Sequence, residues 1–363
     1  MSEAPGAGRT GGAEDVRAVA AELAAAAGGR TLSYMEVCGT HTMAIARHGL
    51  RQLLPDGVRL VSGPGCPVCV TAIGDLDRAV AYARLPQVTL ATFGDLVRVP
   101  ASRTTLAEER AAGADVKVVY SALDAVDLAA AVPEREVVFI GIGFETTAPT
   151  VAAALIAARD RDVRNFSVLC LHKTMPAPLR TLLEAGETPL DGFILPGHVS
   201  VITGPEAFSF LPAEYGVGGV VAGFEPDDVL GALLALARQE TPAIENGYVR
   251  AVHPHGNVVA RQIMDKVFVP CDAHWRGLGE IAGSGLALAP AFAAFDAQER
   301  FTVDPGEPLE PAGCRCGEVL RGLIDPSDCG LFGRRCTPQT PIGACMVSSE
   351  GACAAHFRFR DLV

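Results

Sequence analysis

The sequence has 363 residues, of which 49% are hydrophobic and 20% charged, so it is long enough for two or three domains with sizeable cores. Its formal net charge is −12 and it contains no cluster of Lys and Arg, which argues against binding along the phosphate backbone of nucleic acids. The longest uncharged stretch, Ile281–Phe295, is too short and too broken by Gly and Pro to span a bilayer. Because the N-terminus also lacks the pattern of a signal peptide, we expect a cytoplasmic protein whose thiols stay reduced.

Residues 1–29 are expected to form a flexible segment followed by a helix. Met1–Gly12 is rich in Gly, Ala and Pro, a composition typical of disorder. The alanine-rich run Val19–Ala27 comes next, so we place the start of the first folded domain at residue 30.

Short apolar runs and helical patterns then alternate along the chain. The runs are bounded by turn residues, as buried parallel strands are, and comprise Arg59–Ser62, Val88–Phe93, Val116–Tyr120, Val137–Ile142, Phe166–Leu171, Gly192–Leu195 and Gly219–Ala222. The helices expected between them are Ile73–Ala83, Leu106–Ala112, Leu123–Ala131, Val151–Ala158, Pro178–Ala185 and Pro226–Arg238. Such alternation predicts doubly wound α/β domains with sites at the carboxyl ends of the strands.

Two short motifs occur twice in this region. Gly143-Phe-Glu145 and Gly223-Phe-Glu225 each follow a strand, and the loops Ser62–Gly65 and Leu195–His198 both contain Gly and Pro. We interpret the echo as two related α/β domains that face each other across a cleft, over residues 30–125 and 126–240.

The periodicity changes after Asn246. Tyr248–Val269 has a mostly helical pattern, Trp275–Ala294 is rich in Gly and Ala, and cysteines follow. We therefore expect residues 241–363 to form a C-terminal domain that is mostly helical or irregular.

A group of thiols lies in the first expected domain. Cys38 is followed by His41, and Cys66 and Cys69 lie in a Gly/Pro loop before a helix, a position that favours a lowered thiolate pKa. Three interpretations are open: Cys66 and Cys69 form a redox dithiol, the four side chains form a Cys3His zinc site, or the cysteines are buried and inert. Soft thiolates also suit transient binding of low-valent iron.

Two further loops contain candidate residues. Gly141–Thr146 lies between a strand and a helix, but the third glycine of a dinucleotide fingerprint is missing where Thr146 stands. We interpret it as a turn in which Thr146 or Thr147 caps the helix, with Glu145 pointing into the cleft as the functional alternative. His198 lies just past a strand end, where structural and functional roles are both open.

The last fifty residues contain six of the eleven cysteines: Cys314, Cys316, Cys329, Cys336, Cys345 and Cys353. This stretch has few large apolar residues, so it needs a further means of stabilisation. Four of the thiols, spaced Cys314-x14-Cys329-x6-Cys336-x16-Cys353, suit either a zinc ion or an iron–sulfur cluster. The absence of paired Cys-x2-Cys knuckles favours a [4Fe–4S] cluster, and a reducing compartment disfavours disulfides.

Several of these motifs are long and specific. They are Cys38-Gly-Thr-His41, Gly63-Pro-Gly-Cys-Pro-Val-Cys69, Gly143-Phe-Glu-Thr-Thr-Ala-Pro149, Leu195-Pro-Gly-His-Val-Ser-Val-Ile-Thr-Gly204, and the tail from Cys314-Arg-Cys316 to Met346-Val-Ser-Ser-Glu-Gly-Ala-Cys353. Together they resemble the hydrogenase maturation protein HypD family, from about residue 30 to the C-terminus and without a departure at the motif cysteines.

The resemblance implies a scaffold that assembles the Fe(CN)2(CO) unit of [NiFe] hydrogenases together with the small chaperone HypC, while the partner HypE supplies cyanide. It implies that Cys38 holds the iron transiently with His41 nearby, and that Cys66 and Cys69 are a redox dithiol. His198 and Glu350 match polar positions thought functional in the family. The implied ligands of a [4Fe–4S] cluster are Cys314, Cys329, Cys336 and Cys353, which leaves Cys316 and Cys345 as additional thiols.

We therefore expect a metallocentre-assembly scaffold with redox activity, in which electrons from the cluster reach the Cys66–Cys69 pair and this pair reduces or protonates ligands at the iron. The hydrogenase large subunit would be a partner only indirectly, and the chain alone is expected to be a monomer. Two alternatives remain: a free-standing Fe–S thiol–disulfide oxidoreductase, and a zinc-stabilised binding protein without chemistry.

Overall fold

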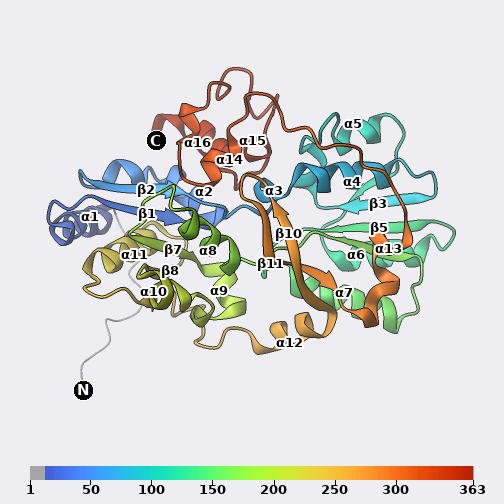
Figure 1. Ribbon diagram of the computed structural model, residues 1–363, viewed down its shortest axis with the longest axis horizontal. Coiled ribbons are helices and arrows are strands. Elements are labelled where there is room, and N and C mark those ends of the chain that lie inside the picture. The colour runs from blue at the N-terminus through green and yellow to red at the C-terminus, as the bar shows by residue number, and fades with distance from the viewer. Residues whose placement is uncertain (1–12, 363) are drawn as a thin grey trace.

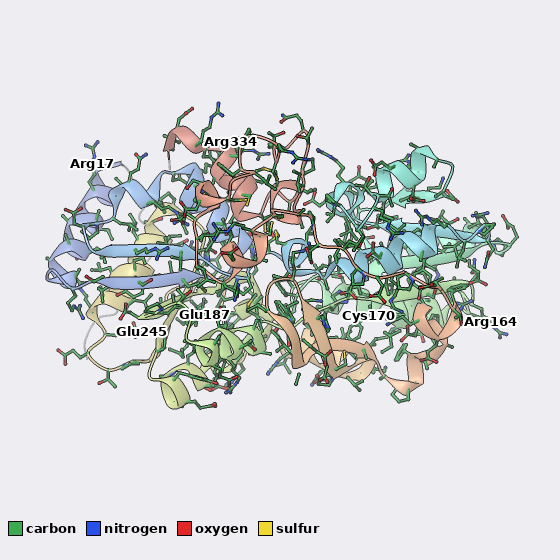
Figure 2. The ribbon with its side chains drawn as sticks, turned by 45° about the horizontal axis from the view of Figure 1, so that its top comes forward. Arg17, Arg164, Cys170, Glu187, Glu245 and Arg334 are labelled. Carbon is green, nitrogen blue, oxygen red and sulfur yellow. A yellow bond between two sulfur atoms is a disulfide. The ribbon has the colours of Figure 1, made fainter. Side chains whose placement is uncertain are left out.

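The computed structural model describes residues 13–362, which form two parallel β-sheets side by side with the C-terminal segment lying over their junction (Figure 1). The flexible segment expected over Met1–Gly12 lies outside the described residues. Between residues 13 and 362 no helix combines the length and the apolar character needed to cross a membrane. Charged side chains such as Arg17, Glu187 and Arg334 lie on the outside (Figure 2).

The first sheet has five parallel strands in the order β2-β1-β7-β8-β9. They are β1 (Leu32–Glu36), β2 (Val58–Ser62), β7 (Gly192–Pro196), β8 (Gly218–Ala222) and β9 (Ile244–Asn246). The accompanying helices are α1 (Ala13–Ala27), α2 (Gly39–Arg47), α8 (Pro176–Ala185), α9 (Gly197–Thr203), α10 (Phe210–Tyr215) and α11 (Pro226–Arg238), with 3-10 turns at Leu50–Leu53 and Pro205–Phe208. The central strands β7 and β8 are buried along their whole length, as strands covered on both faces are.

Helix α1 packs with the helices that cover the first sheet. Leu23 is fully buried in an apolar cluster with Val229 and Leu233 of α11. Glu22 forms an ion pair with Arg238 at 2.8 Å on the rim of this contact. The helix therefore packs on α11 and not on the cysteine-rich C-terminal segment.

The second sheet has four parallel strands in the order β4-β3-β5-β6. They are β3 (Val88–Thr92), β4 (Val116–Val118), β5 (Glu136–Gly141) and β6 (Phe166–Cys170). The helices are α3 (Pro67–Val70), α4 (Ile73–Ala83), α5 (Leu106–Ala111), α6 (Ala122–Ala131) and α7 (Ala148–Asp160), with a 3-10 turn at Gly94–Arg98. Capping boxes at Thr105 and Ser121 fix the starts of α5 and α6.

The two parallel sheets confirm the expected α/β class. However, the expected boundary at residue 125 does not separate the strands of one sheet from those of the other. β3 and β4 pair with β5 and β6, whereas β1 and β2 pair with β7, β8 and β9. The second sheet is thus inserted between two parts of the first. Local sequence pattern identifies a parallel strand without indicating its partner, because parallel neighbours are joined by long crossovers.

The two sheets share a strand order. Numbered within its own sheet, each begins 2-1-3-4, so the order reverses between the first and third strands. The repeated sequence motifs do not lie at equivalent positions of the two sheets. Ser62–Gly65 and Leu195–His198 both follow strands of the first sheet. Likewise Gly143 follows the third strand of its sheet and Gly223 follows the fourth.

An antiparallel hairpin that the sequence pattern does not predict follows the parallel sheets. It consists of β10 (Phe268–Trp275) and β11 (Gly279–Leu288), and α12 (Val258–Val267) precedes it. The helical expectation for Tyr248–Val269 is therefore correct only for its second half. Gly277 and Gly279 adopt positive φ angles of 80° and 78°, which is the backbone freedom that this tight turn requires.

The described residues after β11 form short helices and 3-10 turns joined by loops. They are α13 (Ala297–Arg300), α14 (Cys316–Leu320), α15 (Ala344–Val347) and α16 (Ala352–Arg358), with 3-10 turns at Pro290–Phe295, Pro326–Asp328 and Arg360–Leu362. We call residues 314–353, which contain the six C-terminal cysteines, the cysteine module. Thr188 donates a hydrogen bond to the Arg321 carbonyl at 2.9 Å, and Arg51 lies 3.6 Å from Asp325. These contacts dock the module onto the first sheet.

Candidate functional site

Cys38 and His198 lie at the point where the strand order of the first sheet reverses. Cys38 follows β1 and is the N-cap residue of α2, while His198 follows β7, the neighbour of β1 on its other side. Loops diverge to opposite faces of the sheet at such a switch point, so ligands bind in the crevice between them.

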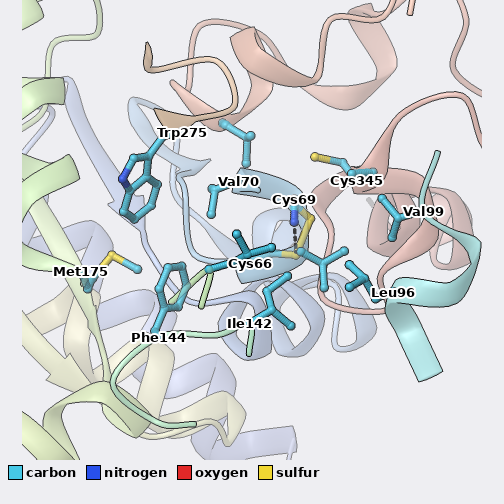
Figure 3. Close-up of a cluster of buried hydrophobic side chains, with 14 of the residues drawn as sticks. Cys66, Cys69, Val70, Leu96, Val99, Ile142, Phe144, Met175, Trp275 and Cys345 are labelled. Atoms are coloured by element: carbon cyan, nitrogen blue, oxygen red, sulfur yellow. Dashed lines mark hydrogen bonds between the residues drawn. A yellow bond between two sulfur atoms is a disulfide. The ribbon is translucent and has the colours of Figure 1, made fainter. Parts of the chain in front are cut away.

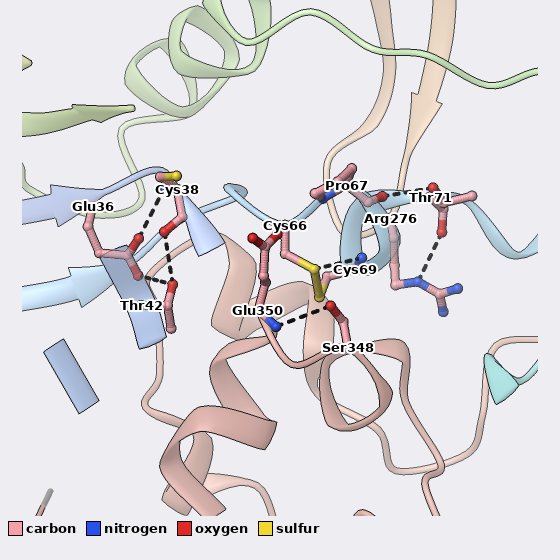
Figure 4. Close-up of a disulfide and its surroundings, with 10 residues drawn as sticks. All are labelled: Glu36, Cys38, Thr42, Cys66, Pro67, Cys69, Thr71, Arg276, Ser348 and Glu350. Carbon is pink, nitrogen blue, oxygen red and sulfur yellow. Dashed lines mark hydrogen bonds between the residues drawn. A yellow bond between two sulfur atoms is a disulfide. The ribbon is translucent and has the colours of Figure 1, made fainter. Parts of the chain in front are cut away.

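Gly65 holds the Cys66 loop against Cys38. A Cβ atom at Gly65 would overlap the backbone of Cys38, and the Gly65 carbonyl accepts a hydrogen bond from the Gly39 N–H at 3.0 Å. The missing side chain therefore lets the ends of β1 and β2 touch. As a result Cys66 and Cys38 lie on neighbouring loops of one site (Figure 4).

A buried carboxyl group fixes the backbone at Cys38. Glu36 accepts a hydrogen bond from the Cys38 N–H at 3.2 Å and one from the Thr42 hydroxyl at 2.6 Å (Figure 4). Burial raises the pKa of Glu36 to about 7. Burial, with a smaller contribution from Glu350, also raises the pKa of Cys38 to about 12, so its thiol is protonated at neutral pH in this structure.

His41 is fully buried behind Cys38. Its Nε2 lies 2.9 Å from the Gly223 carbonyl oxygen, which can only accept, so Nε2 carries the proton. Its Nδ1 has no hydrogen-bond partner among the described residues. Burial lowers the pKa of His41 to about 4, and the ring is therefore neutral at pH 7. The ring of Phe224 packs against both imidazoles, with centroid distances of 4.8 Å to His41 and 4.0 Å to His198.

A cavity of about 350 Å³ opens at Cys38, and we call it the Cys38 cavity. Loops after strands of both sheets line it, as does the cysteine module. Its walls are Val37, Cys38, Thr40, Gly65, Pro67, Phe144, Thr146, Thr147, Pro196, His198, Val199, Val201, Ile202 and Glu350. The volume suits a small polar group, and Cys38 is the only cysteine among these lining residues.

Glu350 reaches the Cys38 cavity from the far end of the chain. Its carboxylate accepts a hydrogen bond from the Thr40 hydroxyl at 3.0 Å, and a Cβ atom at Gly39 would lie 3.0 Å from Glu350 Oε2. Gly39 thus leaves room for the carboxylate beside Cys38. Burial raises the pKa of Glu350.

Cys66 and Cys69 form a disulfide whose Cα atoms are 5.2 Å apart (Figure 4). Both residues are buried, and the Cys69 N–H points at Cys66 Sγ at 3.2 Å. This is the oxidised form of a dithiol, in which neither sulfur is a thiolate. The thiolate expected at this helix start therefore requires reduction of the bond.

The Gly143 loop has a different structure from the one expected. Thr147 is the N-cap residue of α7, but its hydroxyl donates to the Ile142 carbonyl at 3.2 Å and makes no cap hydrogen bond. Glu145 does not line the Cys38 cavity. It is buried and accepts a hydrogen bond from the Met175 N–H at 3.0 Å, and burial raises its pKa to about 7.

The cysteine module gathers its thiols around a second, much smaller cavity. Cys314, Cys316, Cys329, Cys336 and Cys353 line it together with apolar side chains such as Val319 and Met346. Cys345 is fully buried and lies next to Cys316 and Cys353. The fold therefore brings all six thiols together and does not separate the expected ligands from Cys316 and Cys345.

The chemistry of this donor set fits an iron–sulfur cluster. Thiolates are the ligands such clusters use. A Cβ atom at Gly343 would lie 2.6 Å from Cys316 Sγ and 2.7 Å from Cys314 Sγ, so Gly343 keeps space next to two sulfurs. Over residues 13–362, no three His, Cys, Asp or Glu side chains are arranged as ligands of one metal ion.

The module also lies against the disulfide. Cys69 and Cys345 are both fully buried in the same apolar cluster, and Figure 3 shows Cys345 facing the disulfide across it. Helix α15, which carries Cys345, packs on α3, which carries Cys69. The two sulfur centres of the chain are therefore neighbours in one core.

Comparison with known proteins agrees with this arrangement. The HypD family model, described as "Hydrogenase formation hypA family", matches residues 14–360. The chain is 50% identical to the hydrogenase maturation factor HypD of Rhizobium leguminosarum bv. viciae, over 92% of this chain and 90% of the relative. The chain belongs to the HypD family. It is also 48% identical to HypD of Escherichia coli, over 92% of this chain and 90% of that protein, and 47% identical to HypD of Azotobacter vinelandii, over 94% and 93%.

Four residues of the site were missed in the sequence. Glu36 and Gly65 shape the backbone at Cys38, Thr40 binds Glu350, and Phe224 contacts both histidines. Glu36 stands two residues before Cys38 at the end of an apolar run, where a buried acid is unusual, and this was the available signal. The other contacts join segments far apart in the chain.

Proposed function

We propose that the protein is a scaffold for assembling the Fe(CN)2(CO) unit of [NiFe] hydrogenases, with the iron unit as its cargo. The supporting observation is a single cysteine, Cys38, in a cavity of about 350 Å³ at the switch point of a parallel sheet, in a chain of the HypD family. A cavity of this size has room for one iron with small diatomic ligands. The proposed partners are a small HypC-type chaperone and a HypE-type cyanide donor, and the hydrogenase large subunit receives the product indirectly.

In this proposal the residues around the cavity have different roles. The Cys38 sulfur binds the iron, because a soft thiolate suits low-valent iron. Glu36 and Gly65 hold the Cys38 backbone in place through the contacts described above. His41 is neutral and packs close to Cys38 without ionising. The exposed His198 and the half-buried Glu350 offer polar atoms to the cargo and its ligands.

Cys66 and Cys69 are proposed as the redox pair of the site. Reducing their disulfide consumes two electrons and two protons and yields two thiols, and a low-potential electron donor must supply the electrons. The thiols would then stand beside Cys38, where they can deliver protons or electrons to the cargo. We propose Cys314, Cys329, Cys336 and Cys353 as ligands of a [4Fe–4S] cluster, which supplies one-electron redox chemistry when bound.

A second candidate function is a free-standing thiol–disulfide oxidoreductase. The observation that favours it is the disulfide beside a module of six cysteines in one core. This function predicts turnover of a small disulfide substrate by the chain alone, without a partner.

The deciding experiment is anaerobic purification with iron and sulfide analysis, followed by infrared spectroscopy. We expect about four iron and four sulfide per chain, and CN and CO bands when the small chaperone is co-expressed. Cys38→Ser should lose the bands and keep the sulfide. CN and CO bands that persist in Cys38→Ser would rule out Cys38 as the anchor of the iron. A wild-type protein with the cluster but without these bands would favour the oxidoreductase. Zinc in place of iron would overturn the cluster assignment.

A further inference from the structure

Arg276 is a buried cation in a turn that contacts both the segment after the disulfide and the cysteine module. It lies in the turn between β10 and β11, and only 4% of its side chain is exposed. Its Nε donates to the Thr71 carbonyl at 3.2 Å (Figure 4). Its Nη1 donates to Glu310 Oε2 at 3.0 Å. Its Nη2 is buried and has no hydrogen-bond partner among the described residues.

The backbone of Arg276 is hydrogen-bonded to the segment that follows the disulfide. Its N–H donates to the Val70 carbonyl at 2.8 Å, and Thr71 forms an antiparallel bridge with Trp275. Val70 is the last residue of α3, the helix that contains Cys69. The turn is therefore attached to the segment that leaves the disulfide.

The same turn touches the cysteine module. A Cβ atom at Gly277 would lie 2.9 Å from the Gly317 carbonyl oxygen, and one at Gly317 would lie 2.8 Å from the Gly277 Cα. Two glycines thus let the turn lie directly on the residue after Cys316. Cys314 and Cys345 are within electrostatic reach of the guanidinium.

The known partners of Arg276 do not balance its charge. A buried guanidinium with an unpaired donor is costly, since buried charges are normally paired and hydrogen-bonded. Glu310 is the facing carboxylate, but 59% of its side chain is exposed, so solvent screens the pair. A further anion next to Nη2 would accept a hydrogen bond from it and balance the positive charge of the guanidinium.

We propose that Arg276 is the counter-charge of the redox centre held by the cysteine module and that it raises the reduction potential of that centre. The inference rests on the iron–sulfur centre proposed above. A cluster bound by thiolates is anionic and gains one negative charge on reduction, so a fixed cation favours the reduced form. Arg276 is a positioning residue here, because it acts on the centre through charge and does not ligate it.

The test is a reductive titration of the anaerobically purified full-length protein with dithionite, followed by electron paramagnetic resonance. Arg276→Gln removes the charge, and we expect at least a tenfold lower ratio of reduced to oxidised centre at a fixed potential, about 59 mV for a one-electron couple. Arg276→Lys keeps the charge and should stay near the wild type. Arg321→Gln removes a more exposed charge of the module itself, paired with Glu187, and is the matched control.

Glu310→Gln gives an independent test with the opposite sign. It removes the carboxylate that partly neutralises Arg276, so the centre should become easier to reduce, and its exposed position makes misfolding no concern. This variant decides the matter if Arg276→Gln fails to fold. The proposal is overturned if neither variant shifts the potential, or if Arg276→Lys shifts it as far as Arg276→Gln.

The same samples separate this inference from the proposed function. Iron and sulfide in the wild type test the cluster itself, before any variant is compared. Wild-type protein without a cluster defeats the proposed cofactor, whereas wild-type protein with a cluster whose potential ignores Arg276 defeats only the role of Arg276.

Discussion

The carboxylate of Glu350 accepts a hydrogen bond at 3.0 Å from the hydroxyl of Thr40, a residue 310 positions earlier in the chain. The contact places an acid of the cysteine module within the cavity that contains Cys38. A change in the charge or packing of the module can therefore alter the surroundings of Cys38 directly.

Glu350→Gln should make Cys38 more reactive. Glu350 contributes to the raised pKa of Cys38, so removing its negative charge lowers that pKa and increases the thiolate fraction at a given pH. We expect faster alkylation of Cys38 between pH 8 and 9, measured by peptide mass spectrometry. Glu318→Gln removes a partly exposed carboxylate paired with Arg315 and should leave the rate unchanged. Equal rates in all three proteins would contradict the prediction.

Gly65→Ala should separate Cys38 from the Cys66 loop. The added methyl would overlap the Cys38 backbone, and overpacking of this kind costs about 1–3 kcal/mol of unfolding free energy. The control is Gly231→Ala in α11, where a Cβ meets nothing within 4 Å and helix propensity should stabilise by about 0.5–1 kcal/mol. Chemical denaturation measures both, and a neutral Gly65→Ala would show that the two loops can move apart freely.

Replacing both Cys66 and Cys69 with Ala should abolish hydrogenase maturation and leave the cluster spectrum intact. The reason is that these residues lie outside the small cavity lined by the module cysteines. Maturation assays in cells and the visible spectrum of the purified variant check the two halves. Loss of the spectrum in this variant would refute the division between dithiol and cluster.

The stability of the protein should fall as pH rises through neutrality because of Glu145. Burial raises the pKa of this group to about 7 from the ordinary value of 4.5, so folding favours its protonated form. The stabilisation is complete below pH 4.5 and is lost as pH rises toward and past 7, to a limit of about 3 kcal/mol.

Glu145→Gln isolates that effect. The amide oxygen can still accept from the Met175 N–H, and the side chain no longer ionises. We expect the unfolding free energy of the wild type to fall relative to the variant between pH 5 and pH 8, measured by denaturant unfolding. A constant difference across this range would mean that Glu145 is not the titrating group.

Leu23→Ala should destabilise the first sheet although it changes the N-terminal helix. Leu23 is fully buried against α11, and truncating such a side chain costs about 2–5 kcal/mol. Thermal unfolding measures the loss. Glu22→Ala, which removes only the exposed pair with Arg238, should change stability by less than about 1 kcal/mol.

Local pattern was sufficient for most elements of the two sheets. The expected helices Ile73–Ala83 and Pro226–Arg238 match α4 and α11 residue for residue, and seven apolar runs became strands. Leu32–Glu36 was missed because it carries Tyr34 and Glu36 among apolar residues, and Ile244–Asn246 because three residues give no readable period. The hairpin was missed because its strands are partly exposed and contain glycine and proline.

The sequence by itself determined the chemistry available to this protein: a thiol after one strand, a dithiol after the next, and six thiols in a short tail. It also determined the α/β class, since alternating apolar runs and helices bury themselves in few ways. Only the tertiary structure decided which strands pair, and hence that Cys38, His198 and Glu350 share one cavity. It also brought the turn that contains Arg276 into contact with both the segment after the disulfide and the cysteine module. The physical reason is that these contacts join residues tens to hundreds of positions apart, and no local periodicity carries that information.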